Sequence, residues 1–178
     1  MLRKTALGLA LAGVGSIAAA AAPAAKPVIV LVHGAFADAA GWNRVIPILQ
    51  HDGYDVTAVE IPLESLDGDI AATKRVVDAQ AQPVVLVGHS YGGAVITGAA
   101  AGSSKVKALV YLAAFGPDNG EAVGAFGDKY PVDLSKALKP DSAGFLYVDR
   151  AQFHADFAAD LPASDAAVMA VSQKPLNS

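Results

Sequence analysis

Apolar residues form four short runs between about residue 26 and residue 117. Val28–Val32 and Val84–Val87 are unbroken and rich in β-branched residues, which is typical of strands buried on both faces. Tyr54–Ile61 predicts another strand, closed by Pro62, and Ala108–Ala113 predicts a fourth. The runs are too short to be helices of ordinary length, so strands are the favoured interpretation.

Apolar residues between these runs recur at helical spacing. A first helix is predicted over about 41–52, with its apolar face at Trp42, Val45, Ile46 and Leu49 and a stop signal at Gly53. A second helix carries Ile70, Thr73, Val76 and Val77 on one face, and the small residues 94–101 begin a third. Strands that alternate with helices in this way predict the α/β class, with a parallel sheet covered on both faces.

The pattern changes after Phe115, where Gly, Pro and Asp become frequent. We predict a core over residues 26–117 and a partial cap over residues 118–178. Within the cap, Phe145–Val148 predicts a strand, and Ala151–Phe157 and Ser164–Ser172 predict short helices. Ser164 is the predicted N-cap of the second of these helices.

The first 25 residues have the pattern of a secretory signal peptide. Arg3 and Lys4 precede an apolar run from Ala6 to about Ala22, and small residues flank Pro23. The run is shorter than the ~20 residues that a membrane span prefers, so stable membrane insertion is the less favoured alternative. We therefore expect export to the periplasm or the extracellular space.

Composition excludes several classes of protein. The 178-residue chain carries a formal net charge of -4, and its lysines and arginines are scattered, so nucleic acid is not an expected partner. The absence of cysteine excludes disulfides, thiolate nucleophiles and zinc–thiolate sites, and we predict no metal site. The pattern does not indicate an oligomeric state.

The segment Gly88–Gly92 carries the strongest chemical signal. It reads Gly-His-Ser-Tyr-Gly, directly after a predicted buried strand and before a predicted helix. This context indicates a strained strand-to-helix turn that exposes Ser90 as a nucleophile, with Gly88 and Gly92 permitting the close approach of strand and helix. The alternative is that Ser90 only caps a helix. The segment fits neither a dinucleotide fingerprint nor a P-loop.

A second glycine turn, His33–Phe36, follows the first predicted strand. Acyl transfer needs two hydrogen-bond donors for the developing oxyanion, normally one amide after the nucleophile and one from an earlier loop. The backbone amides of Ala35 and Tyr91 are the predicted donors. The alternative is an ordinary turn that only positions the next helix.

Four segments together resemble the α/β-hydrolase superfamily, in particular the esterase branch related to plant methyl esterases and hydroxynitrile lyases. They read LVHGAFADAAGW, VTAVEIP, VVLVGHSYGG and ALVYLAAFGPD, and the resemblance extends from about Val28 to Ser178. It implies a cofactor-free hydrolase with Ser90 as nucleophile, Ala35 and Tyr91 as oxyanion donors, and a cap that closes an apolar pocket for a small-molecule ester. Candidates to line this pocket, or simply to pack the cap, are Phe145, Tyr147, Phe153, Phe157 and Leu161.

The resemblance also implies that the catalytic acid and the histidine base follow strands beyond Ser178, so that the last strands of the fold are absent from residues 1–178. The histidines present have other expected roles: His33 braces the oxyanion loop, His51 ends a helix, His89 is packed beside Ser90, and His154 lies in the cap. Asp118 is expected to be a turn residue. Three hypotheses stay open, namely an ester hydrolase, a hydroxynitrile lyase, and a noncatalytic binding protein or fragment.

Overall fold

The structure is a computed structural model that describes residues 25–118, 120–130 and 132–177. The predicted signal peptide therefore lies almost wholly outside the described residues. Within those residues, no helix combines the length and the apolar character needed to cross a membrane.

A parallel sheet of four strands forms the centre of the core, in the order β2-β1-β3-β4. The strands are β1 Val28–Val32, β2 Val56–Val59, β3 Val84–His89 and β4 Val106–Leu112. The predicted α/β class is confirmed, and all four predicted core strands are present with boundaries within a few residues. Because every strand runs in the same direction, their carboxyl ends meet at one edge of the sheet.

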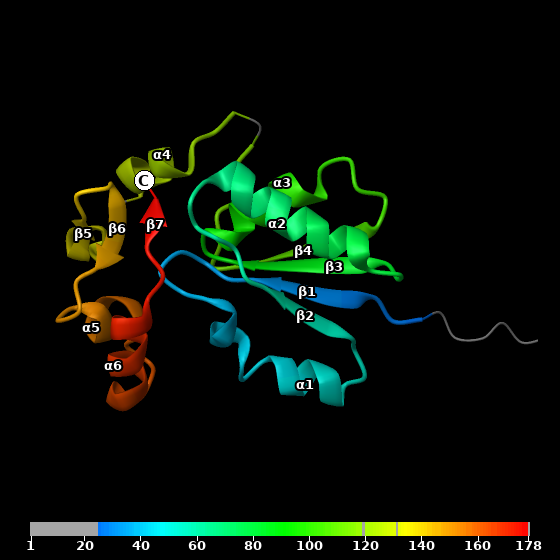
Figure 1. Cartoon of the computed structure of the whole chain (residues 1–178), viewed down its shortest axis with the longest axis horizontal. Helices are drawn as coiled ribbons and strands as arrows, with labels where there is room; N and C mark the ends of the chain where they lie inside the picture. Colours follow the sequence, from blue (N-terminus) through cyan, green and yellow to red (C-terminus); the bar gives the residue numbers. More distant parts are fainter. Residues whose placement is uncertain (1–24, 119, 131, 178) are drawn as a thin grey trace, which may run out of the picture.

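Helices cover both faces of this sheet (Figure 1). They are the short 3-10 helix η1 Ala39–Trp42, α1 Ile46–His51, α2 Leu66–Ala79 and α3 Gly92–Ala100. Strand β1 shows why the apolar run is continuous: Val28, Val30 and Val32 pack on the face covered by α2 and α3. Ile29 and Leu31 pack on the opposite face with Trp42 and residues of α1.

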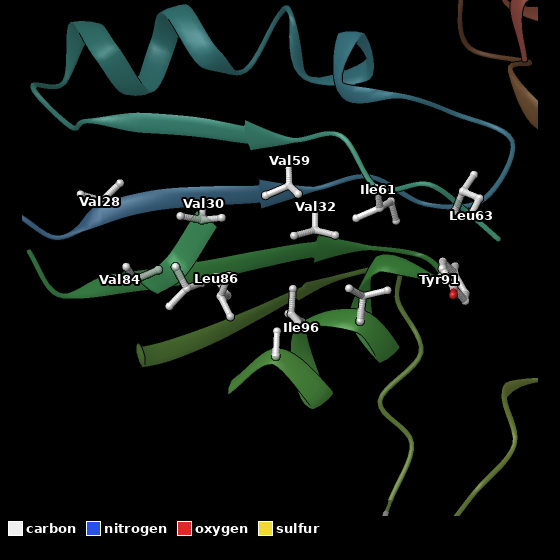
Figure 2. Packing of buried hydrophobic residues seen from close by; sticks show 13 residues of the cluster. Val28, Val30, Val32, Val59, Ile61, Leu63, Val84, Leu86, Tyr91 and Ile96 are labelled. Atoms are coloured by element: carbon white, nitrogen blue, oxygen red, sulfur yellow. The ribbon is translucent and has the colours of Figure 1, made fainter. Parts of the chain in front are cut away.

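The larger of the two core clusters lies between the sheet and α2 and α3. Figure 2 shows Val30, Val32 and Leu86 projecting from adjacent strands toward Ile96 of α3. These four side chains are completely buried. At about 25 cal/mol per Å² of apolar surface removed from water, this burial is the main favourable contribution to the stability of the core.

The cap forms a second, smaller unit around an antiparallel sheet in the order β5-β6-β7. Its elements are α4 Val123–Lys129, η2 Asp133–Ala137, β5 Leu138–Pro140, β6 Phe145–Val148, α5 Phe153–Phe157, α6 Ala163–Ser172 and β7 Leu176–Asn177. Phe153 is fully buried at the centre of the cap cluster, and Phe36 from the core packs into the same cluster. The cap is therefore joined to the core by a shared apolar contact.

Polar contacts also tie the end of the described chain to the core. The Lys174 ammonium donates to Glu60 Oε1 at 2.8 Å, and the Asn177 backbone N–H donates to the Leu63 carbonyl at 2.9 Å. Leu176 packs against both the core cluster and the cap cluster. Residues 174–177 thus run beside residues 60–64 and fix the position of the cap.

Two local predictions were wrong. The helix predicted over 41–52 is split, because Pro47 lacks an N–H group and its ring excludes a helical turn before it, so α1 begins only at Ile46. Ser164 does not cap the last helix: Pro162 occupies the N-cap position, and Ser164 lies inside the first turn. The apolar pattern also gave no sign of β5 or β7.

Strand β4 lies at the edge of the sheet, with only β3 beside it among the described residues. Leu109 packs into the core cluster, whereas Val110 and Leu112, at alternate positions, remain 39% and 43% exposed. An edge strand with unpaired backbone groups and exposed apolar side chains is a template for association with other chains.

We predict that residues 26–178 self-associate through β4. Val110→Lys places a charge on this edge and should increase the monomeric fraction measured by light scattering and size-exclusion chromatography. Val171→Lys is the matched control, because Val171 is a highly exposed residue of α6 and not part of a strand. The prediction would be contradicted if the unsubstituted chain were a soluble monomer that unfolds cooperatively.

Candidate active site

Ser90 lies at a sharp turn between β3 and α3. Its φ of 53° is in the left-handed region, which is unfavourable for a residue with a side chain. Glycines on either side permit this turn: a Cβ atom at Gly88 would lie 2.5 Å from the Gly92 carbonyl oxygen, and one at Gly92 would lie 2.6 Å from the His33 carbonyl oxygen. The predicted roles of Gly88 and Gly92 follow from these backbone contacts.

The loop after β1 lies directly against this turn. A Cβ atom at Gly34 would come within 2.9 Å of Ser90 Cβ, so only glycine allows the two segments to approach so closely. Within the described chain, the backbone N–H groups of Ala35 and Tyr91 donate no hydrogen bond. The two amides predicted as oxyanion donors are thus unused by the protein, and they flank the segments that meet at Ser90.

His33 braces this loop in a neutral form. Its Nε2 accepts a hydrogen bond from the Ile61 backbone N–H at 3.2 Å, so Nδ1 must carry the proton that it donates to the Gly34 carbonyl at 2.8 Å. Burial lowers the pKa of His33, and the bond to Gly34 only partly opposes this effect. Since both ring nitrogens are engaged, His33 is not available to take a proton from Ser90.

A cavity of about 510 Å³ opens beside Ser90 at the carboxyl ends of the strands. Residues from both the core and the cap line it. The large apolar ones are Trp42, Val45, Leu112, Leu134, Phe157, Leu161 and Met169. Ser90 is half-buried, and its hydroxyl makes no hydrogen bond to another described residue. The cavity therefore places a hydroxyl beside a largely apolar space.

A family model described as the alpha/beta hydrolase family matches residues 29–177. The chain belongs to this family. Its parallel sheet, strand-to-helix serine turn and cap agree with that membership. The predicted α/β-hydrolase fold is thereby confirmed.

Two curated relatives of this α/β-hydrolase are from Arabidopsis thaliana. An alpha-hydroxynitrile lyase is 36% identical over 115 residues, which cover 57% of this chain and 45% of the relative. Methylesterase 1 is 31% identical over 124 residues, which cover 59% of this chain and 46% of the relative. The chain spans about half the length of the curated relatives it matches.

A solved structure supports the fold independently. An extracellular alpha/beta-hydrolase from a Paenibacillus species superposes with a TM-score of 0.72, covering 86% of this chain and 68% of that one. At 20% identity, this likeness concerns the fold alone.

The other histidines of this α/β-hydrolase are not bonded to Ser90. His89 lines the cavity, and its ring meets the Trp42 ring edge-on with the ring centroids 6.5 Å apart. Desolvation lowers the pKa of His89. His154 is exposed, with Nε2 3.0 Å from the Leu161 carbonyl oxygen, and His51 lies in the last turn of α1. Asp118 donates its backbone N–H to Glu121 in the turn that follows β4.

Three of the candidate cavity residues lie elsewhere. Phe157 and Leu161 line the cavity, but Phe145 and Tyr147 do not, and Phe153 is buried in the cap cluster. An aromatic residue in the sequence does not reveal which face of its helix or strand meets the cavity, because packing among the elements of the cap sets that orientation.

Asp69 is a buried residue at the site that the sequence did not indicate. Its carboxylate accepts hydrogen bonds from the Tyr91 hydroxyl at 2.8 Å and from the Leu63 backbone N–H at 2.8 Å. Both Asp69 and Tyr91 are buried, and a buried carboxylate is stable only when its oxygens are hydrogen-bonded. The pair fixes the residue after Ser90 to the start of α2.

We predict that this pair makes the folded state less stable as the pH rises into the alkaline range. Burial and the bond to Asp69 raise the pKa of Tyr91 above its ordinary value, so the protonated hydroxyl stabilises the folded state. This contribution is complete below about pH 10, the pKa of tyrosine in the unfolded chain. Above that pH the free energy of unfolding falls by about 1.4 kcal/mol per pH unit. Tyr91→Phe should remove this slope in urea unfolding and cost about 1–3 kcal/mol at neutral pH.

Tyr130→Phe is the control for this measurement, because Tyr130 is 61% exposed. It should leave both the stability and its alkaline slope unchanged. Equal slopes for the native chain and Tyr91→Phe would show that the buried hydroxyl does not contribute as described.

Proposed function

We propose that this α/β-hydrolase cleaves carboxylic esters of small, largely apolar molecules, with Ser90 as the nucleophile. The observation that carries the proposal is the strained Ser90 backbone between two obligatory glycines, beside a cavity of about 510 Å³. A φ of 53° persists at a non-glycine residue only where the surroundings impose it, and such strain is concentrated at functional sites.

In the proposed reaction, Ser90 Oγ attacks the ester carbonyl carbon while its proton passes to a base. The carbonyl oxygen becomes an oxyanion held by the backbone amides of Ala35 and Tyr91, each donor being worth about 3–4 kcal/mol in such sites. The tetrahedral intermediate collapses, the alcohol leaves with a proton, and Ser90 carries the acyl group. Water attacks this acyl-enzyme, releases the acid and restores the hydroxyl.

We assign the base to a histidine in a segment that follows Ser178, as the family resemblance implies. Support comes from the engaged nitrogens of His33 and from the contact of His154 with a backbone carbonyl. The reading frame beyond Ser178 tests this assignment: it should encode a strand that ends in an acidic residue and then a strand followed by histidine.

Labelling with a fluorophosphonate probe tests the nucleophile. The natural chain should take up one phosphonyl group at Ser90, located by peptide mass spectrometry, and Ser90→Ala should take up none. Ser103→Ala, a serine in the loop after α3, is the control and should label like the natural chain. Absence of an adduct in folded protein that carries its natural C-terminus would refute the nucleophile.

A hydroxynitrile lyase is the second candidate function. It is favoured by the 36% identity to the Arabidopsis alpha-hydroxynitrile lyase. Turnover of cyanohydrins without turnover of simple methyl esters would select it. A noncatalytic binding protein is the third candidate, and it predicts ligand binding in the cavity without any Ser90 adduct.

We also propose that the protein is exported after removal of about residues 1–25. The positive start, apolar run and small residues of this segment support export. The exported chain should begin between about residues 21 and 26 when its N-terminus is sequenced. Replacing Leu7, Leu9 and Leu11 with Asp should leave the chain uncleaved in the cytoplasm, whereas an uncleaved exported chain would contradict the proposal.

A further inference from the structure

The cavity beside Ser90 has an asymmetric charge. Asp38, Asp156 and Asp160 line it, and no lysine or arginine does so among the described residues. The two histidines in the lining, His33 and His89, have lowered pKa values because of desolvation, so they add no positive charge at neutral pH. The only formal charges on the lining are therefore negative.

Two of these carboxylates, those of Asp156 and Asp160, have no direct ion-pair or hydrogen-bond partner among the described residues. Lys136 interacts electrostatically with Asp156 but forms its direct ion pair with Asp133 at 2.6 Å, and Arg44 pairs with Asp165 at 3.1 Å. Asp38 differs, since one of its oxygens accepts the Ala40 backbone N–H at 2.8 Å.

Trp42 adds an aromatic side chain to the lining of this cavity. The residue lines the cavity and is only 7% exposed, yet its indole N–H is buried without any hydrogen-bond partner in the described chain. A buried donor without a partner is costly, and functional sites are where such donors persist. In addition, the face of a tryptophan ring attracts cations through its quadrupole.

We propose that this cavity selects esters by charge, preferring a substrate with an ammonium group, accepting a neutral one, and binding one with a carboxylate more weakly. The proposal rests on the ester-cleaving function proposed above and names its substrate class. Asp156 and Asp160 are the specificity-determining residues. The apolar lining binds the hydrocarbon part of all three kinds of substrate, and the carboxylates distinguish among their charged groups.

The expected discrimination is moderate, because Asp156 is half-buried and Asp160 is exposed. Two partly solvated charges that face a ligand charge should change its dissociation constant by about tenfold at low salt. Screening shortens the range of this interaction from about 10 Å at 0.1 M salt to about 3 Å at 1 M. The preference should therefore weaken as salt is added, whereas binding of a neutral ester should not.

The experiment uses Trp42, which is the only tryptophan of the chain, as the reporter of binding. Its emission is titrated with three methyl esters of similar length: methyl hexanoate, the cationic methyl ester of aminocaproic acid, and the anionic monomethyl adipate. None of them absorbs where tryptophan is excited, and Ser90→Ala prevents turnover during the titration. Monomethyl adipate should bind about tenfold more weakly than methyl hexanoate, and the aminocaproate ester more tightly.

The Asp156→Asn/Asp160→Asn variant should bind the three esters with nearly equal affinity. The matched control is Asp55→Asn/Asp78→Asn, which changes the net charge equally. Asp55 precedes β2 and Asp78 lies near the end of α2, so both are at the opposite edge of the sheet. The control variant should retain the full discrimination, and circular dichroism should show both variants folded.

Each outcome decides the proposal. Equal binding of the three esters, unchanged discrimination in Asp156→Asn/Asp160→Asn, or no response of Trp42 to any ester overturns it. Failure of the ester-cleaving function is distinguishable, because that function is judged by the Ser90 adduct and not by Trp42 emission. If the esters are discriminated by charge but Ser90 forms no adduct, the charge selectivity of the cavity is supported and the assignment of Ser90 as nucleophile is refuted.

Discussion

The site depends on how closely three backbone segments approach one another. The turn after β3, the loop after β1 and the start of α3 meet at distances that leave no space for a Cβ atom at Gly34, Gly88 or Gly92. The segment after β4 is equally close, since a Cβ atom at Gly93 would lie 2.3 Å from the Phe115 carbonyl oxygen. Because these contacts involve backbone atoms or the Cβ atom of Ser90, no change of side-chain rotamer can relieve them, and Ser90 keeps its strained conformation.

The sheet and the cap then define the space in front of Ser90. Strands that are apolar on both faces fix the edge where the loops meet, and buried polar groups fix the loops themselves through His33 and through Asp69 with Tyr91. The cap contributes Leu134, Phe157 and Met169 to the same cavity. The core therefore holds Ser90, and the core and the cap together shape the cavity beside it.

Much of this arrangement was predictable from local sequence. The range Val28–Val32 is both the predicted and the observed first strand, and the glycines around Ser90 were enough to indicate the turn. The split before α1 was also predictable, since Pro47 lies within the predicted helix. By contrast, the Asp69–Tyr91 bond joins residues 22 positions apart, and a single buried aspartate in a helix gives no local signal. Asp156 lies in α5, which packs against α6 and η2, so no periodicity within residues 151–157 revealed that it lines the cavity.

Glu60 has a consequence for how the cavity could open. One of its carboxylate oxygens accepts the Ala39 backbone N–H at 3.0 Å, and the other accepts the Lys174 ammonium at 2.8 Å. The loop that carries Ala35 and the terminal segment of the cap therefore share a single anion. A movement of the cap that withdraws Lys174 would remove one of the two contacts that position the Glu60 carboxylate. The position of the cap and the position of the loop beside Ser90 are thus linked through a single side chain.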